Sequence, residues 1–155
     1  MSFRIRGLLA APFEHLLSLS DAALKAQGIQ RLIIREPDSA PCRISLQDAM
    51  VDESVLLLNH AHHASSSPYA ASGPIFIRES ARETFDALNQ VPRALRLRLL
   101  SVRAYTAHGD MLDADVCEGA QLETLISRFF QQADAQFLHV HHARRGCYAC
   151  RIDRA

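Results

Sequence analysis

The densest group of chemically capable side chains lies near the end of the chain, in residues 137–153. His139 and His141 are two residues apart, so on a β-strand both rings project to the same face. An imidazole can exchange protons near neutral pH, and a guanidinium such as that of Arg151 binds carboxylate or phosphate through paired hydrogen bonds. His139 and His141 are therefore candidate acid–base residues, and Arg151 is a candidate anion-binding residue.

Residues 137–153 alternate in the way that the two strands of a β-hairpin do. A three-residue loop, residues 144–146, pairs His141 with Ala149 and His139 with Arg151. Gly146 suits this loop because it tolerates the left-handed backbone that such loops need. This register predicts an apolar face formed by Leu138, Val140, Tyr148, Cys150 and Ile152. The opposite face then carries His139, His141, Cys147 and Arg151, with Ala143 and Ala149 leaving space beside the histidines.

A second hairpin is predicted from residues 100–106 and 111–117, on either side of His108 and Gly109. Only an odd-length loop brings the apolar side chains of both strands onto one face, so we expect a three-residue loop or a bulge at Gly109. The other face then carries Ser101, Arg103, Tyr105, Asp113 and Asp115. The two carboxylates either pair with neighbouring arginines on a solvated face or belong to a functional site.

Four arginines lie in or beside predicted strands, where a guanidinium is costly to bury unless it is paired. Converging guanidinium groups bind carboxylate or phosphate, and the four are Arg43, Arg78, Arg103 and Arg151. The other side chains that could complete such a pocket are Asn59, Ser72, Tyr105, Asp113 and Asp115. The alternative is that the arginines pair with Asp113, Asp115 or Glu79. We predict one cavity on the polar face of the two hairpins, lined by Arg78, Arg103, His139 and His141.

The two H-x-H spacings, His60 with His62 and His139 with His141, also raise the question of a shared metal ion. A catalytic zinc site needs three protein ligands, and the third could come from Asp113, Asp115 or Cys147. No complete ligand signature is present, so neither a metal nor a cofactor is predicted. Cys147 and Cys150 face opposite sides of a regular strand, so we expect no redox or zinc pair.

The remaining elements place this site in an α+β domain. Strands are predicted over residues 3–8, 29–35, 55–60 and 75–78, with an extended piece at 42–46 and helical segments at 12–17, 21–27 and 92–98. A helix over residues 122–133 is predicted by one apolar stripe, Leu122, Leu125, Ile126, Phe129, Phe130 and Ala133. Together these elements predict a mainly antiparallel β-sheet with helices packed on one face, in a single domain spanning residues 1–155.

The composition excludes some partners. A formal net charge of zero argues against nonspecific binding to nucleic acid or to an anionic membrane. No stretch approaches the ~20 apolar residues of a membrane span, and the N-terminus lacks the apolar core of a signal peptide. We therefore expect a cytoplasmic protein with reduced thiols.

Three functions are compatible with these residues. The first is a domain that binds a small anionic molecule, with His139 or His141 as acid or base if the protein is an enzyme. The second is a metal-dependent enzyme that uses the paired histidines. The third is a structural or protein-interaction module whose polar face is an interface, as in a homodimer.

Several motifs are specific in combination: Cys42-Arg43-Ile44-Ser45-Leu46, Ser72-Gly73-Pro74-Ile75-Phe76-Ile77-Arg78, Leu99-Leu100-Ser101-Val102-Arg103-Ala104-Tyr105, and His139-Val140-His141 through Ala143-Arg144-Arg145-Gly146-Cys147. Together they resemble a bacterial family of small proteins known only as a domain of unknown function. The resemblance covers nearly the whole chain and implies no activity. Four residues lie outside its motifs: His62, His63, His142 and Cys150.

Overall fold

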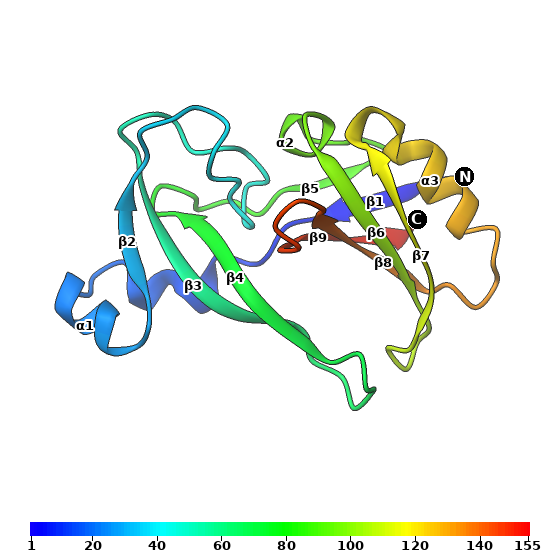
Figure 1. Cartoon of the computed structure of the whole chain (residues 1–155), viewed down its shortest axis with the longest axis horizontal. Coiled ribbons are helices and arrows are strands. Elements are labelled where there is room, and N and C mark those ends of the chain that lie inside the picture. The colour runs from blue at the N-terminus through cyan, green and yellow to red at the C-terminus, as the bar shows by residue number, and fades with distance from the viewer.

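A computed structural model describes residues 1–155 and contains two antiparallel sheets with few helices (Figure 1). The strands are β1 (Phe3–Arg6), β2 (Gln30–Ile33), β3 (Ser54–His63), β4 (Ala71–Arg78), β5 (Asp86–Leu88), β6 (Leu99–Tyr105), β7 (Met111–Glu118), β8 (Phe137–His142) and β9 (Tyr148–Arg154). The α-helices are α1 (Asp21–Ala26), α2 (Arg93–Arg96) and α3 (Leu122–Phe129), and the 3-10 helices are η1 (Ala11–Leu16) and η2 (Gly119–Gln121). The predicted α+β class is confirmed.

The strands divide between a six-stranded sheet in the order β5-β1-β9-β8-β6-β7 and a three-stranded sheet in the order β2-β3-β4. The predicted strand 75–78 starts earlier, at Ala71, because Pro74 is tolerated on an edge strand that needs no further ladder donor there. The predicted extended piece at 42–46 instead forms turns with isolated bridges at Pro41 and Cys42. The three-residue strand β5 is too short to give a periodic signal.

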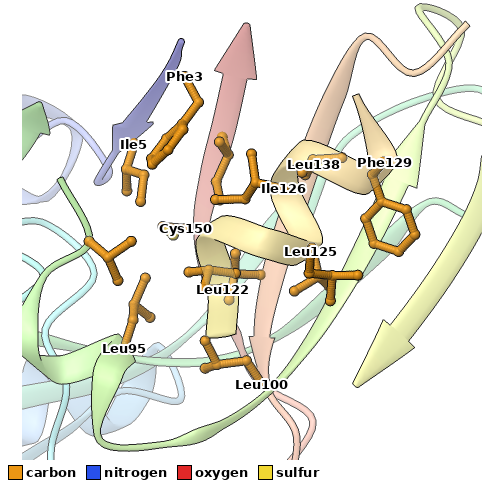
Figure 2. Packing of buried hydrophobic residues seen from close by; sticks show 14 of the residues in the cluster. Phe3, Ile5, Leu95, Leu100, Leu122, Leu125, Ile126, Phe129, Leu138 and Cys150 are labelled. Atoms are coloured by element: carbon orange, nitrogen blue, oxygen red, sulfur yellow. The ribbon is translucent and has the colours of Figure 1, made fainter. Parts of the chain in front are cut away.

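Helix α3 covers one face of the six-stranded sheet. Its apolar stripe, Leu122, Leu125, Ile126 and Phe129, is buried against strand residues that include Ile5, Leu100 and Leu138 (Figure 2). The helix ends at Phe129, earlier than the predicted Ala133, and a turn follows. None of the helices is both long and apolar enough to cross a membrane.

The three-stranded sheet has a core of its own, which includes Phe13, Leu24, Leu56 and Ile75. Its long β3–β4 hairpin extends away from this core, and the tip lies beside the turn between β6 and β7 (Figure 1). Two hydrogen bonds hold the tip there: the His63 ring to the Gly109 carbonyl at 2.8 Å, and the Ser67 hydroxyl to the Asp110 carboxylate at 2.7 Å. The hairpin therefore crosses to the six-stranded sheet.

The β8–β9 hairpin has a four-residue loop, because the His142 amide donates to the Cys147 carbonyl at 2.9 Å. The predicted three-residue loop is wrong. A bulge then shifts the register between His141 and Val140, so that His139 lies opposite Arg151 as predicted. The bulge also moves Tyr148 to the histidine face and buries Ala149 in the core, so Ala149 leaves no space beside the histidines.

In the β6–β7 hairpin the predicted loop length is correct, but the predicted register is wrong. The Thr106 amide donates to the Asp110 carbonyl, which leaves the predicted three-residue loop with Gly109 in the left-handed region at φ 87°. A bulge beyond the loop then shifts the register, so Asp113 lies opposite Ala104 and Asp115 opposite Val102. The prediction that both carboxylates share a face with Arg103 is therefore wrong.

Both carboxylates instead point to the side of the sheet that α3 covers. The Asp115 carboxylate pairs with the Arg128 guanidinium of α3 at 2.7 Å. The Asp113 carboxylate accepts a hydrogen bond at 3.1 Å from the side-chain amide of Gln132, which follows α3. The bulge and these helix-side donors together explain why the simple alternation of the strand does not hold.

Replacing Phe129 with Ala should lower the free energy of unfolding by about 3–5 kcal/mol, because the ring is fully buried between α3 and the sheet. Urea denaturation followed by circular dichroism measures this difference. The exposed Leu112→Ala variant serves as the control and should lose far less. A loss below about 1 kcal/mol for Phe129→Ala would show that the α3 stripe does not carry the core.

Candidate functional site: a cluster of rings between the two sheets

Seven aromatic and imidazole rings pack together on the face of the six-stranded sheet opposite α3. They are His62 and His63 from β3, Tyr105 from β6, Phe137, His139 and His141 from β8, and Tyr148 from β9, and we call them the ring cluster. Neighbouring ring centroids lie between 4.5 Å, for His63 and Tyr105, and 6.4 Å, for His139 and His141. Most of these contacts are tilted or edge-to-face, the arrangement that ring quadrupoles favour.

Local irregularities in the strands bring these rings together. A bulge between His60 and His63 lets two consecutive residues, His62 and His63, both face the cluster. The bulge in β9 adds Tyr148, whose ring stacks on His62 with centroids 5.1 Å apart. His60 lies outside the cluster, with its ring against Phe13.

Two backbone carbonyls fix the tautomers of two histidines. A carbonyl oxygen only accepts, so His63 donates from Nε2 to Gly109 at 2.8 Å, and His141 donates from Nδ1 to Gly146 at 3.0 Å. In the neutral ring of His141 the proton on Nδ1 leaves Nε2 as an acceptor, and this nitrogen is buried without a partner. Nδ1 of His139 and Nδ1 of His62 are also buried without partners. The cluster therefore holds unused hydrogen-bonding capacity.

Three histidines of the cluster, His62, His139 and His141, are held neutral. Burial lowers the pKa of His139 to about 2, and the neighbouring His63 and His141 and then the positive charge of Arg151 act in the same direction. Burial also lowers the pKa of His141 and of His62 to about 4, with Arg103 acting on both in the same direction. No carboxylate is among the causes of these three shifts, so arginine charge acts on the histidines without an offsetting carboxylate; Asp153, beside the cluster, pairs with Arg151 instead.

Three guanidinium groups lie at the ring cluster, and two of them, Arg43 and Arg103, have no carboxylate partner. Arg43 is only 3% exposed and donates to the carbonyls of Tyr148, at 2.6 Å, and Pro41; burial lowers its pKa to about 10. Arg151 lies over the Phe137 ring, with its guanidinium carbon 3.9 Å from the centroid, and pairs with Asp153 at 2.7 Å. Arg103 is half-buried and lies opposite His139 in the ladder.

The pairing of the arginines sets Arg43 and Arg103 apart. Most arginines of the chain form an ion pair with a carboxylate; those without one are Arg43, Arg82, Arg103, Arg144, Arg145 and Arg154. Four of these six are exposed, where water and salt screen the charge. Arg43 and Arg103 are not exposed, and both act on histidines of the ring cluster. The unpaired, poorly solvated positive charge of the protein is therefore concentrated there.

A cavity of about 280 Å³ opens beside the ring cluster, under the β3–β4 tip. It is lined by His62, His63, Ala64, Ser65, Ala107, His108, Gly109, Phe137, His139 and Arg151. A small molecule in it would therefore meet imidazole nitrogens, an aromatic face and a guanidinium. His141 is not part of the lining, because the rings of His62 and Tyr148 pack against it.

The residues predicted for one site fall into separate places. Five of them gather at the ring cluster: His139, His141, Arg103, Arg151 and Tyr105. Arg43 supports the cluster through its hydrogen bond to the carbonyl of Tyr148.

The prediction that Arg78 joins them is wrong: its guanidinium bonds to Glu53 at 2.8 Å and to Gln47 at 3.0 Å, in a different cavity. Asn59 and Ser72 are exposed and line neither this cavity nor the larger ones. Asp113 and Asp115 lie on the α3 side.

The sequence reasoning missed four members of the cluster: His62, His63, Phe137 and Tyr148. The H-x-H spacing of His60 and His62 did draw attention to His62, but as a metal ligand paired with His60. Nowhere do three or more His, Cys, Asp or Glu side chains form an arrangement that could hold a metal ion. The metal-dependent alternative therefore has no ligand set.

The two cysteines of the C-x-x-C spacing lie apart. Cys150 lies in the core beneath α3, whereas Cys147 lies in the β8–β9 turn, and all four cysteines of the chain are free.

Comparison with known proteins adds a family but no activity. No curated protein and no solved structure matches the chain. Residues 39–154 match a family described as "Protein of unknown function (DUF1203)". This span contains the whole ring cluster and every residue that lines its cavity. The chain therefore belongs to the DUF1203 family, in agreement with the resemblance of its motifs to a family of unknown function.

Proposed function

We propose that this protein binds a small anionic molecule, a carboxylate or a phosphate, in the cavity beside the ring cluster. The observation that carries the proposal is the positive charge of Arg43 and Arg103, which are not exposed, form no ion pair and act on His141 of the cluster. A poorly solvated positive charge is costly unless an anion pairs with it. A bound anion would supply that partner.

The cavity favours a small ligand. Its volume of about 280 Å³ lies just below the range of about 300–1,000 Å³ that is usual for ligand pockets. Each neutral imidazole offers one N–H donor and one acceptor, so His62 and His139 can orient the polar groups of a ligand. The Arg151 guanidinium, fixed over the Phe137 ring, supplies a charge-assisted hydrogen bond.

Anion binding should be coupled to proton uptake. The positive field and burial disfavour an imidazolium at His139, and a bound anion would reverse the electrostatic part of this effect. His139 would then hold a proton more readily in the complex than in the free protein. This coupling is what an acid–base role of His139 requires, and that role, like the one predicted for His141, stays a prediction.

The proposal predicts that inorganic phosphate or a small dicarboxylate such as malonate raises the melting temperature in a saturable manner. A ligand at 100 times its Kd adds about 2.7 kcal/mol to the stability. The Arg103→Gln and Arg151→Gln variants should bind the anion about tenfold more weakly. Arg151→Gln removes a charged hydrogen-bond donor from the cavity lining, and Arg103→Gln removes a positive charge beside the cavity. Differential scanning fluorimetry and isothermal titration calorimetry at fixed ionic strength measure both effects.

Arg145→Gln is the matched control, since Arg145 is exposed, has no ion pair and lies outside the cavity lining. It should bind like the wild type. If both cluster variants and the control respond to the anions identically, the stabilisation is a general salt effect and the site is not an anion site. If none of the anions stabilises the wild type, the ring cluster serves only to join the two sheets.

The lowered histidine pKa values predict acid sensitivity. The unfolded chain binds protons on these histidines near pH 6.5, whereas His139 and His141 in the folded protein resist protonation down to about pH 2 and pH 4. Their contribution to stability is therefore complete above pH 6.5 and is lost as the pH falls below it. At pH 5 the loss should be about 2 kcal/mol for each of the two residues relative to pH 7.5.

Urea denaturation at the two pH values measures this difference, and the His139→Gln variant should show a smaller one. His15→Gln provides the control, because His15 is exposed in η1 and its removal should leave the pH dependence unchanged. Equal stability of the wild type at pH 5 and pH 7.5 would contradict a cluster of neutral, buried imidazoles.

A further inference from the structure

A cavity larger than the one beside the ring cluster lies away from it. It has a volume of about 730 Å³ and lies between the loop that joins β2 to β3 and residues 85–94. Its apolar lining includes Leu46, Met50, Val51, Phe85 and Pro92. Met50 is 71% exposed and Val51 is 47% exposed, so large apolar side chains line the cavity without protein to cover them. Exposed apolar surface in a concave site is typical of ligand-binding grooves.

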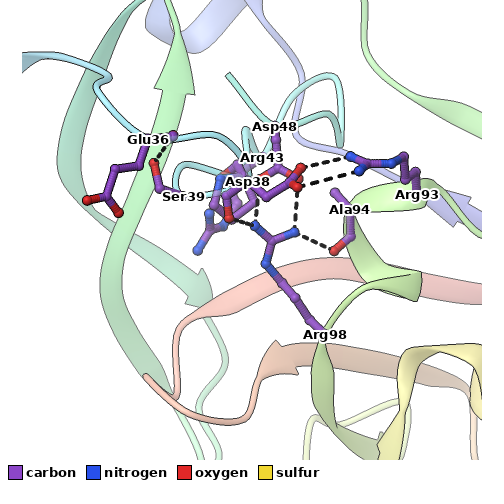
Figure 3. Close-up of polar contacts among 9 residues, drawn as sticks. Glu36, Asp38, Ser39, Arg43, Asp48, Arg93, Ala94 and Arg98 are labelled. Carbon is purple, nitrogen blue, oxygen red and sulfur yellow. Dashed lines mark hydrogen bonds and ion pairs between the residues drawn. The ribbon is translucent and has the colours of Figure 1, made fainter. Parts of the chain in front are cut away.

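The charged groups of this cavity are already used. The Arg93 guanidinium pairs with Asp38 at 2.8 Å, and the Arg98 guanidinium pairs with Asp48 at 2.6 Å (Figure 3). Arg98 also donates to the carbonyls of Asp38 and Ala94, so it ties the loop to α2 (Figure 3). The wall is therefore fixed in place, and it offers a ligand apolar surface rather than unpaired charge.

Two residues of this wall have a left-handed backbone that is uncommon for side chains other than glycine. They are Asp38 at φ 52° and Leu46 at φ 50°. Such conformations cost about 1–3 kcal/mol each and persist where the surrounding structure fixes them, often at ligand clamps. Here the ion pair of Arg93 with the Asp38 carboxylate and the hydrogen bond from Arg98 to the Asp38 carbonyl hold Asp38, and burial in the core of the six-stranded sheet holds Leu46.

A second cavity, of about 420 Å³, adjoins the first at Gln47 and Phe85, which line both. Its lining is polar and contains the hydroxyls of Ser45, Ser80 and Thr84 and two guanidinium groups, Arg78 and Arg82, against one carboxylate, Glu83.

The hydrogen bonds of this lining leave two groups available to a ligand. The Arg78 guanidinium is neutralised by Glu53 at 2.8 Å, but Arg82 bonds only to the carbonyl of Glu79 and has no ion pair. The Ser45 hydroxyl is buried without any hydrogen-bond partner. Arg82 and Glu83 are both exposed and have no ion pair, and an anionic head group would use the Arg82 guanidinium and the unsatisfied Ser45 hydroxyl as donors while Glu83 stays with solvent.

We infer that these adjoining cavities form a second ligand site, for an amphiphile with an apolar chain and an anionic head group. The chain occupies the larger cavity along Met50 and Val51, and the head group lies in the smaller cavity at Arg82 and Ser45. The lining shares no residue with the cavity of the ring cluster, so this site goes beyond the proposed function and does not depend on it.

Octanoate, a medium-chain carboxylate, tests the inference by isothermal titration calorimetry on the full chain. Acetate provides the head group without the chain, and octanol provides the chain without the charge. We expect octanoate to bind with one-to-one stoichiometry and with an affinity at least about tenfold above that of either fragment. Octanol that binds as tightly as octanoate would overturn the head-group assignment. Failure of octanoate to bind, or binding of anionic phospholipid vesicles without binding of free octanoate, would overturn the site.

Two surface variants separate the parts of the site without threatening the fold. Met50→Asp should weaken octanoate binding about tenfold by placing a carboxylate in the apolar wall, and Arg82→Gln should do so by removing the free cation. Leu88→Asp is the matched control, since Leu88 is 47% exposed on β5 and lies outside both linings. Arg103→Gln, which weakens phosphate binding at the ring cluster, should leave octanoate binding unchanged. Equal loss in Met50→Asp and Leu88→Asp would contradict the placement of the chain.

Discussion

The packing of rings between two sheets is the contact on which the arrangement of this protein depends. Each sheet has its own hydrophobic core, and the β3–β4 hairpin reaches the other sheet through His62 and His63. Imidazole rings can fill such a joint as aromatic rings do, but they bring nitrogen atoms that must be satisfied or left without partners. Because the pKa values of His62, His139 and His141 are lowered, protonation of these three rings destabilises the joint, which ties the stability of the protein to the pH.

The regular elements could be predicted from the sequence because their signals are local. The alternation of residues 137–141 predicted Leu138 and Val140 in the core and His139 and His141 on the other face, and the period of residues 122–129 predicted the α3 stripe. The helical segment predicted at 21–27 matches α1 to within one residue at its end. The bulges could not be predicted in this way. One extra residue reverses the faces of everything beyond it and leaves no trace in composition or period.

The convergence of the arginines was only half predicted, for a related reason. A guanidinium on a strand needs a partner, but the sequence does not say which carboxylate folds back to it. Glu53 comes directly before β3 and meets Arg78 across the β3–β4 ladder, which removes Arg78 from the candidate site. Arg43 instead bonds to the carbonyls of Tyr148 and Pro41, so its charge remains unbalanced beneath the ring cluster. Long-range pairing of this kind decides which arginines are available to a ligand.

The bulge in β7 decides both the face on which Asp113 and Asp115 lie and the absence of a carboxylate beside Arg103. Without it, the three-residue loop would place Asp113 and Asp115 on the same face as Arg103, and ion pairs there would cancel the positive field at the histidines. With it, the two carboxylates turn to the α3 side, where each also accepts a hydrogen bond from the next backbone amide, Ala114 at 2.8 Å and Val116 at 2.7 Å. Because β7 is an edge strand, these bonds also protect its free donors from pairing with another chain. A single inserted residue thus caps the sheet edge and leaves Arg103 without a carboxylate, which is the condition that an anion site at the ring cluster requires.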